Sequence, residues 1–190
     1  MRHHENLKIL AFVGLAGSGK STAVDYLTEK GYPKVYFGGV IYDAMREAGI
    51  EITPESQTTF REEIREKEGK DFVVKRIIAQ IEKLTEAGQH RIIADGLYSW
   101  SEYKIMKHAF PGQLTLVAIV APRKLRHHRL ANRPERPFTE KEAETRDWTE
   151  IENLEKGGPI AIADYYLVND KDPEELYRQV EEVRENTSFR

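Results

Sequence analysis

The chain has 190 residues, of which 39% are hydrophobic; this is enough for the core of one α/β domain and short for two. Its 29 basic and 32 acidic side chains give a net charge of −3, which argues against a surface that binds nucleic acid or anionic membrane over its whole extent, although a local basic site is compatible with it. Cysteine is absent, which excludes disulfides, thiol nucleophiles and cysteine-ligated zinc.

Membrane insertion and export are not indicated by the sequence. No apolar run approaches the roughly 20 residues that a helix needs to span a bilayer. The basic start at residues 1–7 leads into a glycine-rich segment and not into a small-residue cleavage site. We therefore expect a cytoplasmic protein without membrane association. The chain also lacks internal repeats and low-complexity linkers, which predicts one domain over residues 1–190.

Apolar runs alternate with helical patterns along the chain. Residues 8–13 are almost entirely apolar, which is typical of a strand buried on both faces of a parallel sheet. Similar runs follow at 91–94, 114–120 and 165–168, with a weaker one at 34–37. Helices are expected at about 20–30, 40–48, 57–68, 71–87, 100–109, 122–132, 139–156 and 173–186. This alternation predicts right-handed crossovers and an α/β fold with a parallel sheet of about five strands.

The helix over 71–87 has the clearest sequence pattern. Asp71 is expected to cap its beginning, and Gly88 is expected to end it. Its apolar side chains fall on one stripe, which consists of Phe72, Val73, Ile77, Ile78, Ile81 and Leu84.

Residues 14–21 read G-L-A-G-S-G-K-S, follow a predicted strand and precede a predicted helix. Glycines allow the backbone to bend so that successive N–H groups point at phosphate oxygens, and the helix adds its positive N-terminal end. Lys20 would place an ammonium on the terminal phosphates, and the Ser21 hydroxyl would ligate Mg²⁺. The residues expected to bind ATP here are Gly14, Ala16, Gly17, Ser18, Gly19, Lys20, Ser21 and Thr22. The alternative is a glycine-rich turn with a chance lysine.

Asp95 comes at the end of the strand predicted at 91–94 and precedes Gly96. The carboxyl end of such a strand, beside a phosphate loop, is where an α/β sheet can hold Mg²⁺ or its waters. The competing interpretation is an Asp-Gly turn. We expect Asp95 and Ser21 to form the metal site.

Residues 121–137 concentrate positive charge, with six arginines and lysines against Glu135 alone. On a helix, Arg126, Arg129 and Arg133 would share one face, and Pro134 and Pro137 would then break the helix. Arginines on a mobile segment can neutralise a phosphoryl group in transfer and exclude water. The alternatives are a solvated basic face and a patch for RNA.

The two histidines of this segment, His127 and His128, are expected to be surface residues and not metal ligands, because no carboxylate at ligand spacing accompanies them.

With these motifs the chain resembles the P-loop nucleoside monophosphate kinases of the adenylate kinase-like group, and most narrowly the archaeal nucleotide kinases related to dephospho-coenzyme A kinase. The resemblance covers most of the chain. It rests on the phosphate loop and on the segments at 37–41, 95–96, 129–133, 146–147, 161–165 and 168–169, together with Arg136.

The resemblance implies a P-loop NTPase three-layer fold, an acceptor-binding arm at 38–87 and a short lid at 130–146. It implies that Arg129 stacks on the adenine and that Asn169 borders the base. It also implies that Arg133, Arg136 and Arg146 hold the phosphates.

The acceptor side departs from the family pattern. Gly39 and Tyr42 stand where the family usually has an aspartate and an arginine, and Leu97 and Tyr98 stand where an arginine usually follows Asp-Gly. The missing arginines would hold the acceptor's phosphate, so an ordinary nucleoside monophosphate is in question. Arg46 or Arg61 could substitute, or each could be a plain helix-surface arginine. Tyr42, Tyr98 and Trp100 could form an aromatic wall, or could pack in the core.

The sequence thus predicts an ATP- and Mg²⁺-dependent phosphotransferase with a small, nucleotide-like acceptor, such as a nucleoside monophosphate or a dephospho-coenzyme A-like molecule. The expected catalytic residues are Lys20, Asp95, Arg129, Arg133, Arg136 and Arg146, and the expected acceptor-binding residues are Gly39, Tyr42, Arg46 and Tyr98. The first rival is a nucleotide-binding switch that hydrolyses ATP slowly without a small-molecule acceptor. The second is an RNA-associated ATPase that uses the basic patch over 123–136.

Overall fold

The computed structural model of the chain describes residues 6–97 and 99–190, with the backbone alone at positions 54, 55, 57, 58, 61, 62 and 65. The first half contains β1 (Lys8–Val13), α1 (Lys20–Glu29), β2 (Lys34–Tyr36), α2 (Gly39–Glu47), α3 (Pro54–Glu68), α4 (Phe72–Glu86) and β3 (Arg91–Asp95). The second half contains α5 (Trp100–Ala109), β4 (Leu114–Val120), α6 (Arg123–Ala131), α7 (Glu140–Glu152), α8 (Gly157–Ala161), β5 (Tyr165–Val168) and α9 (Pro173–Asn186).

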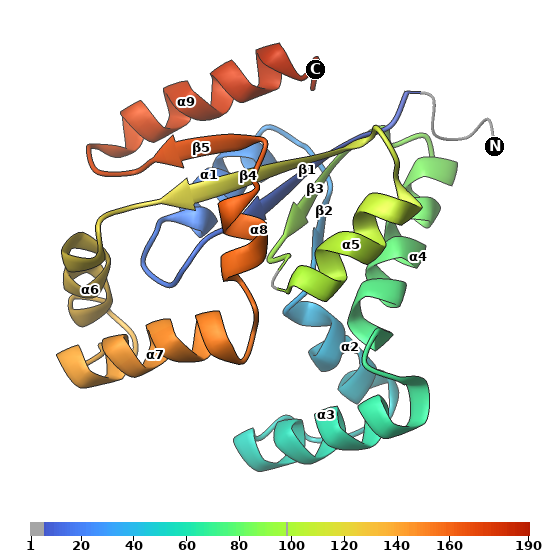
Figure 1. Cartoon of the computed structure of the whole chain (residues 1–190). Helices are drawn as coiled ribbons and strands as arrows, with labels where there is room; N and C mark the ends of the chain where they lie inside the picture. Colours follow the sequence, from blue (N-terminus) through green and yellow to red (C-terminus); the bar gives the residue numbers. More distant parts are fainter. Residues whose placement is uncertain (1–5, 98) are drawn as a thin grey trace.

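The five strands form one sheet in the order β2-β3-β1-β4-β5, and every pairing is parallel (Figure 1). The predicted parallel sheet is therefore confirmed. β1 lies at its centre, with Phe12 in register with Asp95 of β3 and with Val117 of β4. Because all strands run the same way, their carboxyl ends meet at one edge, where ligands of α/β proteins bind.

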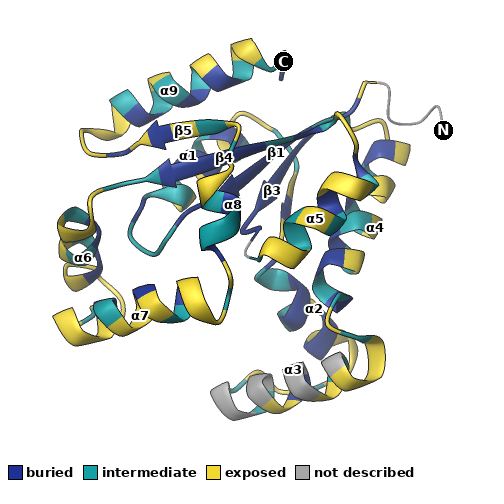
Figure 2. Cartoon of the chain, viewed as in Figure 1, coloured by how far each residue is buried: buried dark blue, intermediate teal, exposed yellow. Residues whose placement is uncertain are grey.

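Side chains of β1 alternate between two cores. Ile9 and Ala11 face the core beneath α4 and α5, whereas Leu10 and Phe12 face the core beneath α1 and α9. All four are buried, as Figure 2 shows for the central strands. The nearly continuous apolar run is thus explained by helices on both faces of the sheet.

Two local predictions were wrong. The helix predicted over 139–156 ends at Glu152; Glu155 takes a left-handed conformation (φ 52°), and the separate helix α8 begins at Gly157. Asp71 occupies the N-cap position of α4, but its side chain accepts no backbone N–H. Its backbone (φ −88°, ψ 4°) lacks the extended conformation that aims a capping side chain at the first turn. Gly88, with φ 86°, ends α4 as predicted.

Two groups of helices lie beyond the carboxyl edge of the sheet. Figure 1 shows α2 and α3 on the side of β2, and α6 and α7 on the side of β4 and β5. The phosphate loop, residues 14–21, runs from β1 into α1 between these groups. Within the described part of the chain, none of the helices combines the length and apolarity needed to cross a membrane.

Candidate functional site

The phosphate loop is bent at two glycines and closely packed from outside. Gly17 and Gly19 have φ values of +78° and +93°, which favour glycine. A Cβ on Gly17 would lie 2.6 Å from the Arg126 carbonyl oxygen, and one on Gly19 would lie 2.0 Å from Nδ2 of Asn169. The bend therefore needs glycine for two reasons. Positive φ values favour glycine, and a side chain at either position would collide with α6 or with Asn169.

Lys20 and Asp95 meet at the centre of the edge. Lys20 begins α1 and Asp95 ends β3, the strand next to β1, so the topology brings together residues far apart in sequence. The Lys20 ammonium donates a hydrogen bond to Oδ1 of Asp95, and the side chains are 15% and 9% exposed. The phosphate-loop lysine and the predicted metal carboxylate thus lie in direct contact.

The chemistry of the oxygen donors here suits Mg²⁺. The Asp95 carboxylate and the Ser21 hydroxyl are hard oxygen ligands, and Mg²⁺ is commonly held by one or two such groups together with phosphates and waters. Among the described residues no cluster of three or more His, Cys, Asp or Glu side chains could hold a metal. By their chemistry, these two predicted oxygen donors fit a magnesium ion that arrives with a polyphosphate.

Arg129 and Asn169 join the loop to α6 and to the end of β5. Arg129 donates to the Gly17 carbonyl oxygen at 3.3 Å and to the Asn169 carbonyl oxygen at 3.0 Å. The buried Asn169 amide donates from Nδ2 to the Ser18 carbonyl oxygen at 2.8 Å. Both residues that were expected near the base are thus placed against the phosphate loop.

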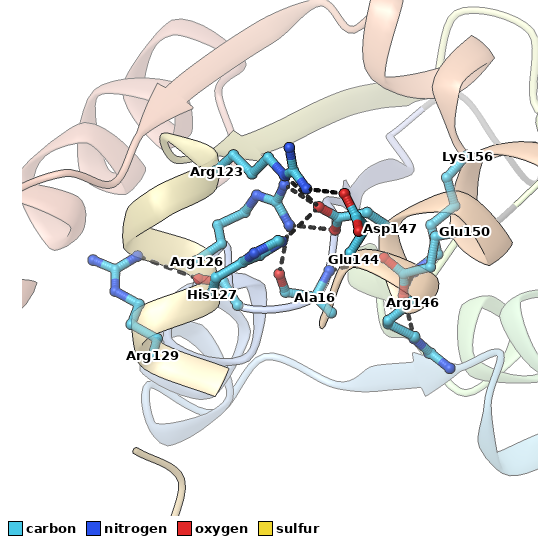
Figure 3. Close-up of polar contacts among 11 residues, drawn as sticks. Ala16, Arg123, Arg126, His127, Arg129, Glu144, Arg146, Asp147, Glu150 and Lys156 are labelled. Carbon is cyan, nitrogen blue, oxygen red and sulfur yellow. Dashed lines mark hydrogen bonds and ion pairs between the residues drawn. The ribbon is translucent and has the colours of Figure 1, made fainter. Parts of the chain in front are cut away.

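A buried ion pair lies between α6 and α7 (Figure 3). Arg126 donates to both carboxylate oxygens of Asp147, at 2.6 and 2.9 Å, and also to the Ala16 carbonyl oxygen at 3.0 Å. Nε2 of His127 lies 2.9 Å from the same carboxylate. Burial raises the pKa of Asp147, but the hydrogen bonds from Arg126 and His127 outweigh it, so that the pKa is lowered overall.

This cluster corrects two expectations. Arg126 does not share an open face with Arg129, because it is buried; the end of α6 at Ala131 agrees with the predicted end of the helix near 132, ahead of Arg133. His127 is not a surface residue, because its side chain is 13% exposed and contacts Asp147. The sequence spacing alone did not reveal this partner, which is supplied by another helix.

A second buried cluster forms where α7 meets α8 (Figure 3). The Ala16 N–H donates to Oε2 of Glu150 at 2.8 Å. Oε1 of Glu150 accepts from Lys156 at 2.7 Å and from Arg146 at 3.1 Å. The side chains of Glu150 and Lys156 are 1% and 4% exposed, whereas that of Arg146 is 46% exposed. Burial lowers the pKa of Lys156, the charges of Arg146 and Lys20 lower it further, and Glu150 raises it.

Sequence reasoning missed Glu150 and Lys156. The available signal was the spacing of Ala143, Asp147 and Glu150, which places two acidic side chains on the buried face of α7. A helix that turns acidic residues inward needs cations opposite them.

The remaining predicted arginines lie in the segment between α6 and α7 or on α7. Arg133 and Arg136 are exposed, and the Arg133 guanidinium lies 5.2 Å from the centre of the Phe138 ring. Arg136 takes a left-handed backbone conformation (φ 50°). The break in the helix near Pro134 is confirmed. Arg129 contacts the phosphate loop at Gly17, whereas the contact of Arg133 is with Phe138, which follows it in the chain.

Three of the residues predicted to bind the acceptor belong to α2. Gly39 is its first residue, Tyr42 is half-buried, and the exposed Arg46 pairs with Asp43 at 2.5 Å. Arg46 lines a surface depression of about 320 Å³ between α2 and α4, none of whose lining residues belongs to the phosphate loop. Tyr98 and the side chain of Arg61 lie outside the described part of the chain.

Two aromatic side chains near this region, those of Trp100 and Tyr36, pack against neighbouring residues but remain partly exposed. Trp100 stacks on Tyr103 with ring centres 5.6 Å apart and lies against Gly158 of α8, but it is 37% exposed and so does not pack in the core. Tyr36, which sequence analysis did not single out, ends β2 with 44% exposure, and its ring lies against Gly38 and Gly39.

Comparisons with other sequences agree with these observations. Residues 10–155 match the family described as AAA domain. The chain is 32% identical over 180 residues to the UPF0200 protein of Thermococcus onnurineus (strain NA1), covering 93% of this chain and 96% of that protein. It is 35% identical over 182 residues to the UPF0200 protein of Sulfurisphaera tokodaii (strain DSM 16993 / JCM 10545 / NBRC 100140 / 7), with 93% and 96% covered.

Similar solved structures include small-molecule kinases. A gluconokinase from Sinorhizobium meliloti 1021 superposes with a TM-score of 0.58 at 17% identity and covers 96% of each chain. A shikimate kinase from Bacteroides thetaiotaomicron superposes with a TM-score of 0.59 at 12% identity, covering 95% of this chain and 98% of that one. At these identities the likeness concerns the fold, and it confirms the predicted P-loop NTPase fold. The relation to dephospho-coenzyme A kinases stays a prediction.

The Arg126–Asp147 pair should make the free energy of unfolding depend on pH in the acidic range. Because the folded-state pKa of Asp147 lies below its ordinary 3.8, its contribution is present above about pH 4 and is lost as the pH falls through the lowered value. Asp147→Asn leaves the Arg126 guanidinium buried without its counter-charge and should cost about 3–5 kcal/mol of unfolding free energy at neutral pH. Urea denaturation at several pH values should also show that the free energy of unfolding falls less with decreasing pH in the variant than in the wild type.

Glu144→Gln is the matched control, because Glu144 pairs with Arg123 on the same two helices in an exposed position. It should change the unfolding free energy by no more than about 1 kcal/mol. An equally small effect of Asp147→Asn would contradict the assignment of a buried, stabilising pair.

The energetic effect of the close approach of Asn169 to Gly19 can be tested by comparing Gly19→Ala with the same substitution at Gly31. Gly31 has φ +91°, close to the +93° of Gly19, but a Cβ there would meet nothing within 4 Å. Gly31→Ala should therefore cost only the backbone strain, about 1–2 kcal/mol. Gly19→Ala must also displace Asn169 from the Ser18 carbonyl oxygen and should cost more. Equal unfolding free energies for the two variants would show that the contact contributes nothing.

Proposed function

Because the chain belongs to the UPF0200 family and carries the AAA domain over residues 10–155, we propose that it is an ATP- and Mg²⁺-dependent phosphotransferase with a small, nucleotide-like acceptor. The observation that carries the proposal is the contact of Lys20 with Asp95 at the mouth of a glycine-bent loop. Such a loop offers its backbone N–H groups and the start of α1 to an anion.

The proposed donor site uses the loop and its lysine. The N–H groups of residues 17–21 would hold the β- and γ-phosphates, and Lys20 would exchange its contact with Asp95 for one with phosphate oxygens. Ser21 and Asp95 would hold Mg²⁺, whose charge offsets that of the bound phosphates. If the acceptor attacks through a hydroxyl, Asp95 would take its proton; an acceptor that attacks through a phosphate needs no base.

Four arginines would stabilise the transferring phosphoryl group. Arg129 is already fixed against the loop by two carbonyl oxygens. Arg133 and Arg136 are exposed beside two prolines, so a movement of the segment 130–146 would bring them over the phosphates. Arg146 donates from Nε to Glu150 and is half exposed, so its guanidinium would be accessible to a ligand. Positioning and charge neutralisation supply most of the catalysis in this chemistry.

The acceptor would bind on the side of α2, near Gly39, Tyr42, Arg46 and Tyr98. One observation favours a second candidate, a slow ATPase or nucleotide-dependent switch without a small acceptor. Arg46, the described arginine on α2 that could hold an acceptor phosphate, is paired with Asp43. A kinase needs an acceptor to consume ATP at an appreciable rate, whereas a switch does not.

Replacing Lys20 tests the donor site. Lys20→Ala should lower the rate of ADP formation by about 100-fold or more, because one transition-state cation is lost, while the fold persists. The assay measures ADP release with and without nucleoside monophosphates, nucleosides and dephospho-coenzyme A, in Mg²⁺ and in EDTA. Lys124→Ala, at an exposed position of α6, is the control and should turn over like the wild type.

The outcomes separate the candidates. Turnover that requires Mg²⁺ and one class of acceptor supports the kinase. Slow turnover indifferent to every acceptor favours the switch. A Lys20→Ala variant as active as the wild type would overturn the site.

A further inference from the structure

The peptide groups of Ala16, in the middle of the phosphate loop, are bonded on both sides by charged side chains from two helices. Glu150 of α7 accepts the Ala16 N–H at 2.8 Å, and Arg126 of α6 donates to the Ala16 carbonyl oxygen at 3.0 Å. Figure 3 shows Ala16 between these side chains. The sequence separations are 134 and 110 residues, so tertiary structure alone creates these contacts.

The contact with Glu150 is unusual for a loop that binds anions. Its carboxylate is 1% exposed and accepts hydrogen bonds from three donors. An unneutralised carboxylate beside the loop would repel a polyphosphate, and the repulsion would be strong because little water screens it. A carboxylate in this position is therefore compatible with phosphate binding only if a cation stays beside it.

Lys156 supplies that cation. Its ammonium lies 2.7 Å from Oε1 of Glu150, and its side chain is 4% exposed. Burial is the main cause that lowers the pKa of Lys156, and the positive charges of Arg146 and Lys20 add to it. The second cation, Arg146, lies one turn before Glu150 on α7 and is half exposed.

We propose that Glu150 and Lys156 are positioning residues for the phosphate loop: the carboxylate fixes the Ala16 peptide, and the ammonium keeps that carboxylate from repelling bound phosphates. The proposal rests on the proposed binding of MgATP. Neither residue is assigned a contact with the nucleotide, so both act through the loop. The other role available to the pair is simply to fasten α7 to α8.

A double-mutant cycle separates the two roles. The variants are Glu150→Gln, Lys156→Met and the combination of both, with MgATP affinity measured by calorimetry and stability by thermal unfolding. Lys156→Met leaves the Glu150 carboxylate at the loop with the half-exposed Arg146 as its remaining cation, and should weaken MgATP binding about 10- to 100-fold, the range of one interaction with a charged group. Adding Glu150→Gln removes that charge and should restore the affinity to within about threefold of the wild type.

A second comparison isolates the hydrogen bond to Ala16. The combinations Glu150→Gln with Lys156→Met and Glu150→Met with Lys156→Met both remove one negative and one positive charge, so the net charge of the site is unchanged. They differ in the oxygen that accepts the Ala16 N–H. The combination with methionine at position 150 should bind MgATP about tenfold more weakly than the one with glutamine, since the partly buried Ala16 N–H loses the side-chain oxygen that fixes it. Glu152→Gln, at an exposed position of α7, is the control.

The results discriminate as follows. If the wild type binds MgATP and every folded variant binds it equally well, the pair only fastens the helices and the inference is overturned. If Lys156→Met does not fold, the two double variants still decide, and equal affinities for them overturn the inference. If the wild type binds no MgATP at all, the proposed function itself fails.

Discussion

The sharp bend between β1 and α1 is the constraint on which the rest of the site depends. A loop whose N–H groups point inward has no regular partners of its own, so its shape must be imposed from outside. Here α6 approaches Gly17, and Asn169 approaches Gly19. The Ala16 peptide is bonded to side chains of α6 and α7. The helices beyond the sheet therefore shape the loop as well as surround it.

Charge around the loop is organised as pairs, and their place in the fold differs with the role proposed for them. The pairs are Lys20 with Asp95, Arg126 with Asp147, and Lys156 with Glu150. The last two are buried between helices, where breaking them would leave an uncompensated charge. The first lies at the central edge of the sheet, where a polyphosphate and its metal would compete for both partners. Because each of these cations is paired with a carboxylate, the chain can bring them together near the loop before an anionic ligand binds.

Local patterns failed where a conformation depended on a neighbouring element. The apolar runs predicted all five strands, because helices on both faces of a parallel sheet require continuous apolar strands. The helix predicted through residue 156 was interrupted at Glu152, and the turn after it carries Lys156 to the carboxylate of Glu150. His127 was interpreted as a surface residue because its partner Asp147 belongs to another helix.

The sequence alone determined those parts of this protein whose functional residues follow one another along the chain. The phosphate loop could be read directly, because the strand, the glycines, Lys20 and the helix follow one another within one short stretch. Asp95 could be inferred from its place at the end of a strand. Tertiary structure alone decided that Glu150, Lys156 and Asp147 gather around the loop, since charged residues on a helix look alike in sequence whether they face water or a buried partner. Only the packing of α6, α7 and α8 against the loop removed that ambiguity, because burying a charge requires a counter-charge that no local pattern specifies.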